Sequence, residues 1–526
     1  MVTLDTHRPE LAAGRHDRFG RLLRAEWTKF RTVRGWVIAL LIAAALPTMF
    51  ALLNNSSCGG AGGACAAPPT GPGGEAVTDQ YSFVHRALAA DGAITVRVTS
   101  LTGLIGLNSG SASGGAAADP TAGWTPGLEP WSKAGIIITA SDKPGSAYAA
   151  MMVTGGHGVR MQWNYTGDSA GLDGTPTTAA PSWLRLIRHG DTITGYDSAD
   201  GASWTKVAAV TLTGLPTAAQ GGLFATSPAR SVTLSQSAIG QSSTSSTTQD
   251  TGTFDHLSLS GGWQSGKWTS GDVGDTNGPS GLDTFRPAGG GFTVSGSGDI
   301  APGVFGQGAA GARIEDAISV GPFAALIAAG VLGALFVTTE YRRGLIRVTL
   351  AASPRRGRVL AAKAIVVGAV TFAAGIAGIA IALPVGLAKL RAGGNPILPV
   401  TALTELRVIA GAAALIAVAA VLALAIGVVL RRGALAVTAV TVAVVLPYLL
   451  AITALPVGVA DWVLRITPAA AIAVEQSVPA YSQVTADYTP MAGYYPLAPW
   501  AGFAVLCAWT AAVLALAAFL LHRRDA

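Results

Sequence analysis

Six long apolar stretches without a charged side chain constrain this chain more than any other feature of its sequence. Each is long enough, or nearly so, to cross the hydrocarbon core of a bilayer, which is about 30 Å thick. The helices of a soluble core would carry a polar face, which disfavours the alternative of six buried helices in a soluble protein. The stretches are Trp36–Leu53, Ile318–Thr339, Ala364–Ala388, Val408–Leu430, Ala434–Pro456 and Trp500–Leu521. We therefore predict six transmembrane helices.

The basic residues outside these stretches predict the orientation of the chain. Eight Lys and Arg precede Trp36 and seven lie in 340–363, whereas the two shorter loops on the other side carry three and one. Lys and Arg favour cytoplasmic loops. Residues 54–316 hold 12 basic and 19 acidic side chains and are expected to face outward. We expect a multi-pass plasma-membrane protein with both termini cytoplasmic, and we attribute its net charge of +6 to topology, not to nucleic-acid binding.

The outward segment is predicted to form a β domain. Residues 54–78 are rich in Gly, Ala and Pro and favour a flexible tether. Residues 79–300 hold short apolar or alternating runs separated by turn residues, which is typical of an antiparallel β-sandwich. A linker, 301–317, follows. The expected strands include Ala93–Val98, Gly135–Ile138, Tyr148–Val153, Val159–Tyr165, Trp183–Arg188, Thr192–Tyr196, Val207–Leu212 and Gly291–Val294.

The N-terminal segment 1–35 is predicted to contain an amphipathic helix. On a helix, five apolar side chains share one face and the arginines lie outside it. Those five are Phe19, Leu22, Leu23, Trp27 and Phe30. We expect this helix to lie on the cytoplasmic surface of the membrane, in contact with lipid. A generic basic anchor fits the segment equally well.

The three cysteines allow one disulfide. Cys58 and Cys65 lie just outside the first predicted helix, in an oxidising compartment, and the glycines between them allow a small loop to close. A disulfide and two free thiols both remain open. Cys507 lies within the last apolar stretch and is interpreted as a small apolar residue.

No complete catalytic or nucleotide-binding motif is found in the sequence. Gly261–Trp268 comes close to a phosphate-binding loop, but Trp268 stands where Ser or Thr would hold Mg²⁺. The β domain has three glutamates, Glu75, Glu129 and Glu315, and they do not form the carboxylate pair that a glycosidase needs. We therefore predict no enzyme activity, no catalytic or metal-binding residues and no cofactor on this chain.

Two segments together resemble the type-2 ABC exporter permeases. Leu22–Arg34 is similar to the interfacial helix of that family, and Glu340–Lys363 is similar to its first cytoplasmic loop. The resemblance implies a cytoplasmic ATPase subunit as partner and a second permease, either a copy of this chain or a homologue. It also implies short helices before the last membrane helix, here within 457–499 at Trp462–Val474 and Tyr494–Pro499. The last predicted helix leads to a cytoplasmic tail, 522–526.

The same resemblance implies that Glu26, Glu340, Tyr341, Arg342 and Arg343 couple the permease to its ATPase. The alternative is that these arginines only satisfy the positive-inside rule. The family's first outer loop is usually short, whereas this chain has a whole domain there.

The β domain resembles concanavalin/laminin-G-like jelly rolls over about residues 80–260, through Trp131–Ile138, Gly158–Trp163 and Gly221–Ala225. Many jelly rolls of this type bind glycans, which makes Trp163, Asn164 and Tyr165 candidates for glycan contact; the alternative is that these aromatic residues belong to the core. Ser198–Trp204 is similar to an Asp-box hairpin, in which Asp200 and Gly201 would shape the turn and Trp204 would pack beneath it.

The predicted fold is a mixed membrane protein: a six-helix transmembrane bundle with an all-β antiparallel jelly roll inserted between helices 1 and 2. The predicted function is the permease subunit of an ATP-driven exporter. One alternative is a membrane-anchored receptor or scaffold that binds cell-surface glycan and transports nothing. A membrane-bound hydrolase is the weakest reading, since it lacks a catalytic set.

Overall fold

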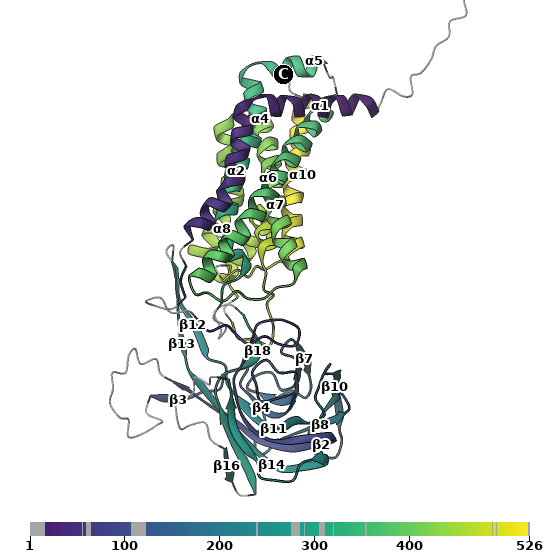
Figure 1. Ribbon diagram of the computed structural model, residues 1–526. Coiled ribbons are helices and arrows are strands. Elements are labelled where there is room, and N and C mark those ends of the chain that lie inside the picture. The colour runs from purple at the N-terminus through teal and green to yellow at the C-terminus, as the bar shows by residue number, and fades with distance from the viewer. Residues whose placement is uncertain are drawn as a thin grey trace, which may run out of the picture.

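The computed structural model of the chain has a helical bundle at one end and a β domain at the other (Figure 1). It describes residues 16–54, 56–58, 65–106, 123–237, 240–274, 285–288, 290–304, 311–318, 320–352, 355–486, 488–490 and 492–523. Helix α1 (His16–Thr32) lies across the end of the bundle that faces away from the β domain. Residues 1–15 of the predicted N-terminal segment and 524–526 of the predicted tail lie outside the described residues.

Six helices are long and apolar enough to cross a membrane, as predicted. They are α2 (Arg34–Leu53), α4 (Gly321–Arg342), α6 (Arg356–Ala392), α7 (Ala402–Leu430), α8 (Gly433–Thr453) and α10 (Pro499–Arg523). Helix α4 continues past the uncharged stretch, and α6 begins well before Ala364, because backbone hydrogen bonds do not depend on apolar side chains. Glu340 and Lys363 therefore belong to long helices. Between these helices, part of the predicted loop forms the short helix α5 (Leu345–Ala352).

Close approach between backbones holds the bundle together. Helix α7 is central and packs against α4, α6, α8 and α10. A Cβ added at Gly333 of α4 would overlap the carbonyl oxygen of Ala420 in α7. A Cβ at Gly386 of α6 would overlap the carbonyl oxygen of Ala317 in the short helix α3 (Ile314–Ile318). Small residues at such crossings are typical of membrane helices, whose association depends on packing.

The segment before the last helix differs in part from the prediction. Helix α9 (Val457–Ile466) and the 3₁₀ helix η2 (Pro468–Glu475) replace the single helix expected at Trp462–Val474. They separate at Thr467, which has an extended backbone because the following proline disfavours the helical region. The helix expected at Tyr494–Pro499 was wrong: only Pro499 is helical there, at the start of α10, where a missing N–H costs nothing.

Eighteen strands lie between α2 and α4 in the described residues. They are β1 (Val77–Asp79), β2 (Tyr81–Gly106), β3 (Trp124–Pro126), β4 (Lys133–Thr139), β5 (Tyr148–Thr154), β6 (Val159–Trp163), β7 (Gly167–Ala170), β8 (Ser182–His189), β9 (Thr192–Ser198), β10 (Thr205–Thr211), β11 (Ala219–Thr226), β12 (Arg230–Ser237), β13 (Gly240–Ser246), β14 (Thr248–Trp263), β15 (Thr269–Val273), β16 (Phe285–Ala288), β17 (Gly291–Gly296) and β18 (Ile300–Pro302). All pairs between these strands are antiparallel, so the predicted antiparallel β domain is present.

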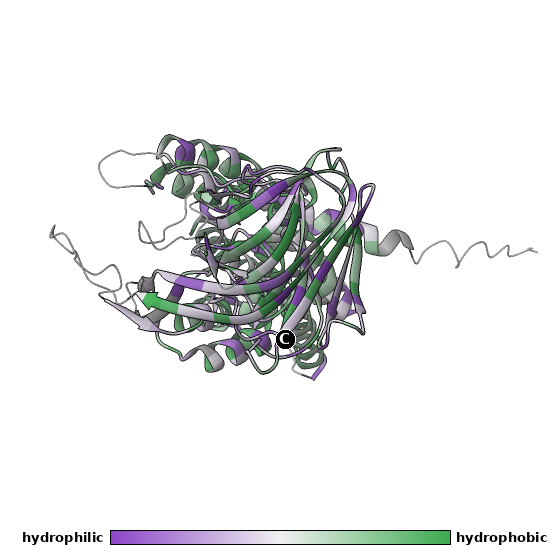
Figure 2. Ribbon diagram, turned by 90° about the horizontal axis from the view of Figure 1, so that it is seen from below, coloured by the Kyte–Doolittle hydropathy of each residue, from purple (hydrophilic) through white to green (hydrophobic). Residues whose placement is uncertain are grey.

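One large sheet organises the β domain. Its main path runs β10-β9-β8-β2-β11-β4-β5-β6-β7, and the long strand β2 pairs with β11 and β15 near its start and with β8 and β14 further along. Strands β4 and β5 are buried on both faces, which explains the uninterrupted apolar run Gly135–Ile138. Seen from the β-domain side, the long curved strands carry alternating apolar and polar residues (Figure 2). The alternation matches a sheet with one face on a core.

The β domain is fixed to the bundle at several places. Strand β1 pairs with β18, which brings the two ends of the domain together. The Cys58 and Cys65 backbone N–H groups donate to carbonyl oxygens of the loop after α6, at 3.0 and 3.1 Å, and the structure joins the two cysteines as a disulfide. The Gln483 amide donates to the carbonyl oxygens of Tyr165 and Thr166. The described part of the predicted flexible tether is therefore fixed by hydrogen bonds to the loop after α6 and to β18.

Candidate functional site

Four charged side chains meet between α1, α4 and α6, at the end of the bundle away from the β domain. Lys363 Nζ lies 2.8 and 2.9 Å from the two carboxylate oxygens of Glu26 and 2.5 Å from Glu340 Oε1. Lys29 forms an ion pair with the same Glu340 oxygen. Both ammonium groups lie near the Phe336 ring, with Nζ–centroid distances of 5.2 Å for Lys363 and 5.6 Å for Lys29. We call Glu26, Lys29, Glu340 and Lys363 the charge cluster.

The charge cluster is buried because α1 presents Glu26 on its apolar face. Side chains three and four positions apart share one face of a helix, so Glu26 projects with Leu22, Leu23 and Phe30 toward the bundle. Glu26 is 5% exposed, and Glu340 and Lys363 are each 1% exposed. Burial, reinforced by the charge of Lys363, lowers the pKa of Lys29 to about 8. Two lysines and two glutamates balance one another, so the cluster ties α1 to α4 and α6.

The five predicted coupling residues do not share one surface. Arg342 and Arg343 are exposed at the end of α4. Tyr341 is half-buried, and the Arg431 guanidinium lies 5.3 Å from its ring centroid. Glu26 and Glu340 face inward in the charge cluster, so a partner protein on the surface would not touch their carboxylates.

The sequence analysis missed Lys363 as a member of this site. The residue stands at the edge of the third apolar stretch, where a lysine is ordinary for a membrane helix. Its partner Glu26 is 337 positions away in the chain, so no local pattern connects the two.

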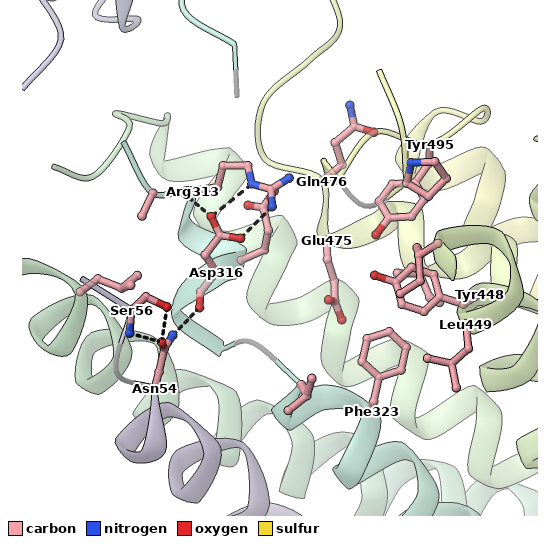
Figure 3. Close-up of a pocket in the computed structure, with 18 of the residues that line it drawn as sticks. Asn54, Ser56, Arg313, Asp316, Phe323, Tyr448, Leu449, Glu475, Gln476 and Tyr495 are labelled. Atoms are coloured by element: carbon pink, nitrogen blue, oxygen red, sulfur yellow. Dashed lines mark hydrogen bonds and ion pairs between the residues drawn. The ribbon is translucent and has the colours of Figure 1, made fainter. Parts of the chain in front are cut away.

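A cavity of about 590 Å³ lies at the opposite end of the bundle (Figure 3). Its walls come from α3, α4, α8 and η2 and from the segments that join them to the β domain. Glu475, at the end of η2, projects between Asp316 on one side and Tyr448 on the other. Phe323 stacks on Tyr448 with a centroid separation of 5.0 Å and an interplanar angle of 22°.

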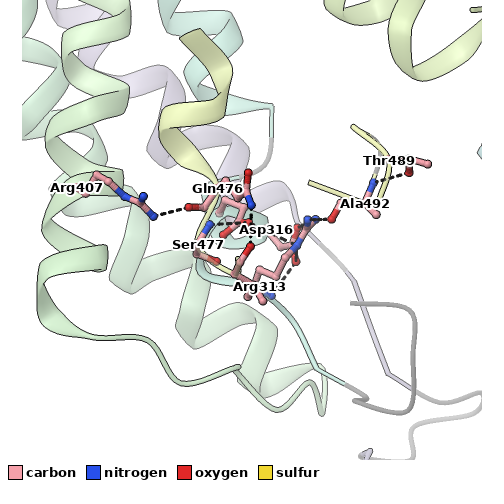
Figure 4. Close-up of polar contacts among 9 residues, drawn as sticks. Arg313, Asp316, Arg407, Gln476, Ser477, Thr489 and Ala492 are labelled. Carbon is pink, nitrogen blue, oxygen red and sulfur yellow. Dashed lines mark hydrogen bonds and ion pairs between the residues drawn. The ribbon is translucent and has the colours of Figure 1, made fainter. Parts of the chain in front are cut away.

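Polar contacts around Arg313 form one wall of this cavity (Figure 4). Arg313 Nη2 lies 2.8 Å from one Asp316 carboxylate oxygen, and Nε lies 3.2 Å from the other. The Arg313 guanidinium also donates to the Ala492 carbonyl and lies 3.6 Å from Glu315. Nearby, Arg407 Nη2 donates to the Gln476 carbonyl at 2.5 Å. Arg313 is thus engaged by carboxylates and backbone and joins α3 to the segment before α10.

Glu475 lacks such partners. It is 8% exposed, and no other described residue donates a hydrogen bond to its carboxylate. Burial raises its pKa to about 8, and the negative charge of Glu315 adds to the effect. The sequence analysis passed over this residue, although a single glutamate after the apolar run 468–474 is a usable signal in a membrane protein.

The three candidate glycan residues do not form an exposed platform. Tyr165 is 1% exposed, and its hydroxyl donates to Asp79 Oδ2 at 2.7 Å. Asn164 accepts a hydrogen bond from the Tyr148 backbone N–H at 3.2 Å, and the half-buried Trp163 packs against the core of the β domain. The enclosed Tyr165 ring offers no face on which a sugar could stack. These contacts favour the alternative that the residues belong to the core.

The Asp200 hairpin has the geometry of a structural turn. The Asp200 carboxylate accepts from the backbone N–H groups of Ala202 and Ser203, each at 2.8 Å. These hydrogen bonds lower the pKa of Asp200. Gly201 has a φ of +74°, which favours glycine, and Arg185 stacks 3.7 Å from the Trp204 ring.

The buried carboxyl group of Asp79 makes the stability of the β domain depend on pH. Burial raises the pKa of Asp79 to about 7 in the folded chain, above the ordinary value of 3.8. The folded state therefore favours the protonated acid, and the free energy of unfolding falls as pH rises from about 4 to about 7. We expect Asp79→Asn to stabilise the protein by up to about 4 kcal/mol above pH 7 and by almost nothing near pH 4.

Thermal unfolding of the full chain in detergent at pH 4.5 and pH 8 checks this prediction. Asn can retain the acceptor for Tyr165 and Gly145, whose donors both reach one oxygen of Asp79. Asp191→Asn, at an exposed site, is the matched control and should change neither value. An equal effect of Asp79→Asn at both pH values would contradict the assignment.

Within the described ranges, no group of three or more His, Cys, Asp or Glu side chains is placed to hold a metal ion.

Comparison with known proteins gives one informative match. The family described as "ABC-2 family transporter protein" matches residues 201–526, which is more than half of the chain. No curated protein sequence matches the chain.

Solved structures give weaker likenesses. A functionally unknown protein from Saccharomyces cerevisiae is 14% identical, with 39% of this chain and 91% of that chain covered and a TM-score of 0.21. Scytalido-glutamic peptidase with a transition state analog inhibitor is 10% identical, with 42% and 98% covered and a TM-score of 0.25. At these TM-scores neither carries a functional argument.

Proposed function

This chain belongs to the ABC-2 family of transporter proteins, and on that premise we propose that it is the permease subunit of an ATP-driven exporter. The observation that carries the proposal is the family match across five of the six membrane-length helices. ATP hydrolysis takes place on a separate subunit, because the phosphate-binding-loop-like segment of this chain ends in Trp268.

The end of the bundle that carries α1 is proposed to face the cytoplasm and the ATPase. The basic side chains gathered there support this orientation. Arg342 and Arg343 are exposed and free to meet acidic groups of the ATPase. The charge cluster lies directly behind them, since Glu340 precedes Arg342 on the same helix. Movement of this end of α4 is transmitted to α6 through the contact between Glu340 and Lys363, and from there to α1 through Glu26.

The transport path is proposed to run between two permeases, this chain and a copy or homologue. The β domain then stands over the exit on the outer side. Its antiparallel pairing and its two separate apolar cores support the jelly-roll class that the sequence suggests. A glycan ligand for this domain would need a surface other than the enclosed Tyr165.

Charge reversal at the exposed arginines tests the ATPase contact. The full chain carrying Arg342→Glu and Arg343→Glu is solubilised from its native membrane and captured, and the co-purifying ABC ATPase is quantified by mass spectrometry and ATP hydrolysis. We expect the wild-type chain to retain the ATPase in stoichiometric amount. Recovery with the double variant should fall by about tenfold or more, because complementary charges at an interface become repulsive.

Lys206→Glu with Arg286→Glu is the matched control, since it makes the same change in net charge at exposed positions of the β domain. This control should retain the ATPase. Absence of any ABC ATPase from the wild-type sample would contradict the proposal that this chain is a permease subunit. Equal loss in both double variants would instead show that net charge, and not the α4 surface, is responsible.

A further inference from the structure

We propose that the cavity beside Glu475 is a binding site for an organic cation with an apolar body. Its volume of about 590 Å³ lies within the range of small-molecule sites, roughly 300–1,000 Å³. The proposal goes beyond the export function, because equilibrium binding at this site needs neither ATP nor an ATPase subunit.

Among the three carboxylates of the cavity wall, Glu475 is the one that Arg313 does not engage. Arg313 is the only Lys or Arg among the described lining residues, and Asp316, Glu315 and the Ala492 carbonyl already surround it. Glu475 points into the same cavity without a hydrogen-bond donor among the described residues. An isolated buried carboxylate is costly, and a proton or a bound cation removes the cost. Burial also raises the pKa of Glu475 to about 8.

Aromatic rings complete the site on the side facing Glu475. Tyr448 and Phe323 form a stacked pair, and Tyr495 lies beside Tyr448 (Figure 3). Ring faces attract cations, most strongly where water is excluded. The remaining wall is largely apolar, with Val445 and Ile472 among its residues. A carboxylate, aromatic faces and an apolar wall together suit a cation that also carries hydrocarbon.

The cavity has a side from which such a ligand could enter. Val320 and Leu449 line it and are also exposed, at 52% and 46%. Both belong to the helical part of the protein, where exposed apolar side chains face lipid. Two sources share the required chemistry: a dissolved amphiphilic cation and the ammonium headgroup of a lipid.

Equilibrium binding of radiolabelled tetraphenylphosphonium to the purified full chain in dodecylmaltoside tests the proposal. We expect saturable binding that Glu475→Gln weakens at least tenfold. Tyr448→Leu should weaken it about fivefold through loss of the ring face. Glu405→Gln is the matched control, because Glu405 is an exposed carboxylate outside the cavity, and it should bind as the wild type does. Triphenylphosphine oxide, a neutral analogue, should bind far more weakly than the cation.

Two results would overturn the proposal: unchanged affinity in Glu475→Gln, or a neutral analogue that binds as tightly as the cation. If Glu475→Gln fails to fold, judged by its thermal unfolding, the Tyr448→Leu variant and the neutral analogue decide the question.

Competition binding identifies whether the natural ligand is a dissolved cation or a lipid headgroup. Displacement of the probe by phosphatidylethanolamine but not by phosphatidylglycerol assigns the site to a lipid ammonium, and no displacement by either assigns it to a dissolved cation. Failure of binding would leave the ATPase contact untouched, since that is measured separately.

Discussion

Replacing Lys363 by methionine is expected to cost the folded chain about 3–5 kcal/mol of unfolding free energy. The lysine satisfies both Glu26 carboxylate oxygens and one oxygen of Glu340, and all three side chains are buried. Methionine fills much of the same volume, so the loss comes from the carboxylates left behind and not from a cavity. Thermal unfolding of the purified chain, followed by tryptophan fluorescence, measures the effect.

Two comparisons make the Lys363 result specific. Lys389→Met removes an exposed lysine from the other end of the same helix and should leave the unfolding temperature almost unchanged. Adding Glu26→Gln and Glu340→Gln to Lys363→Met should recover part of the lost stability, because it removes the buried negative charges. A Lys363→Met chain as stable as the Lys389→Met chain would show that the carboxylates find other partners and that the cluster does not hold α1.

The same substitution should also separate two roles in the proposed exporter. Arg342 and Arg343 remain exposed in a Lys363→Met chain, so ATPase capture should persist where the protein folds. Helix α4 carries Glu340 of the charge cluster near one end and Phe323 of the cavity near the other. A tilt of α4 therefore moves the charge cluster and the cavity wall at the same time. We expect ATP hydrolysis without transport when the α1 contact is lost.

The helices could be predicted because the bilayer imposes their length and composition. A stretch such as Val408–Leu430 has few other stable environments. The strands could be predicted where apolar residues are continuous or alternate, as at Gly135–Ile138 in β4 and Thr192–Tyr196 in β9. The 26-residue strand β2 was only partly found, because Asp91-Gly92 resembles a turn, whereas the strand continues through it and β14 pairs beside it.

The sites could not be predicted to the same degree, because each joins residues that are distant in the chain. Glu26 and Glu340 were chosen through a family resemblance, yet their partner Lys363 and their burial depend on how α1 folds onto the bundle. In the sequence, Tyr165 fits either a glycan contact or the core of the β domain. The structure settles its place, because Tyr165 is 1% exposed and its hydroxyl donates to Asp79. The sequence marks Glu475 as a single acidic residue after an apolar run, but only the structure shows that Arg313 in the same cavity wall is engaged by other groups.

Replacing Lys133 by methionine is expected to destabilise the β domain by about 3–5 kcal/mol. Lys133 is fully buried in β4, and its Nζ lies 2.6 Å from Asp299 Oδ1 and 2.7 Å from the Ile300 carbonyl oxygen. Asp299 has only 7% exposure, so water replaces the ammonium poorly. The loss of stability should be greatest at the end of the domain next to the membrane helices, where Ile300 begins β18.

Hydrogen exchange locates this effect within the full chain. Because β18 pairs with β1, the amides of Val77–Asp79 should exchange faster in Lys133→Met, while those of β9 change little. Lys143→Met, at an exposed lysine of the same domain, is the matched control. Adding Asp299→Asn to Lys133→Met should restore part of the protection, since the buried charge is gone. Uniform loss of protection across the domain would contradict a local role for the Lys133–Asp299 pair. Protection lost at β1 alone would mean that this pair closes the domain where its two ends meet the membrane helices.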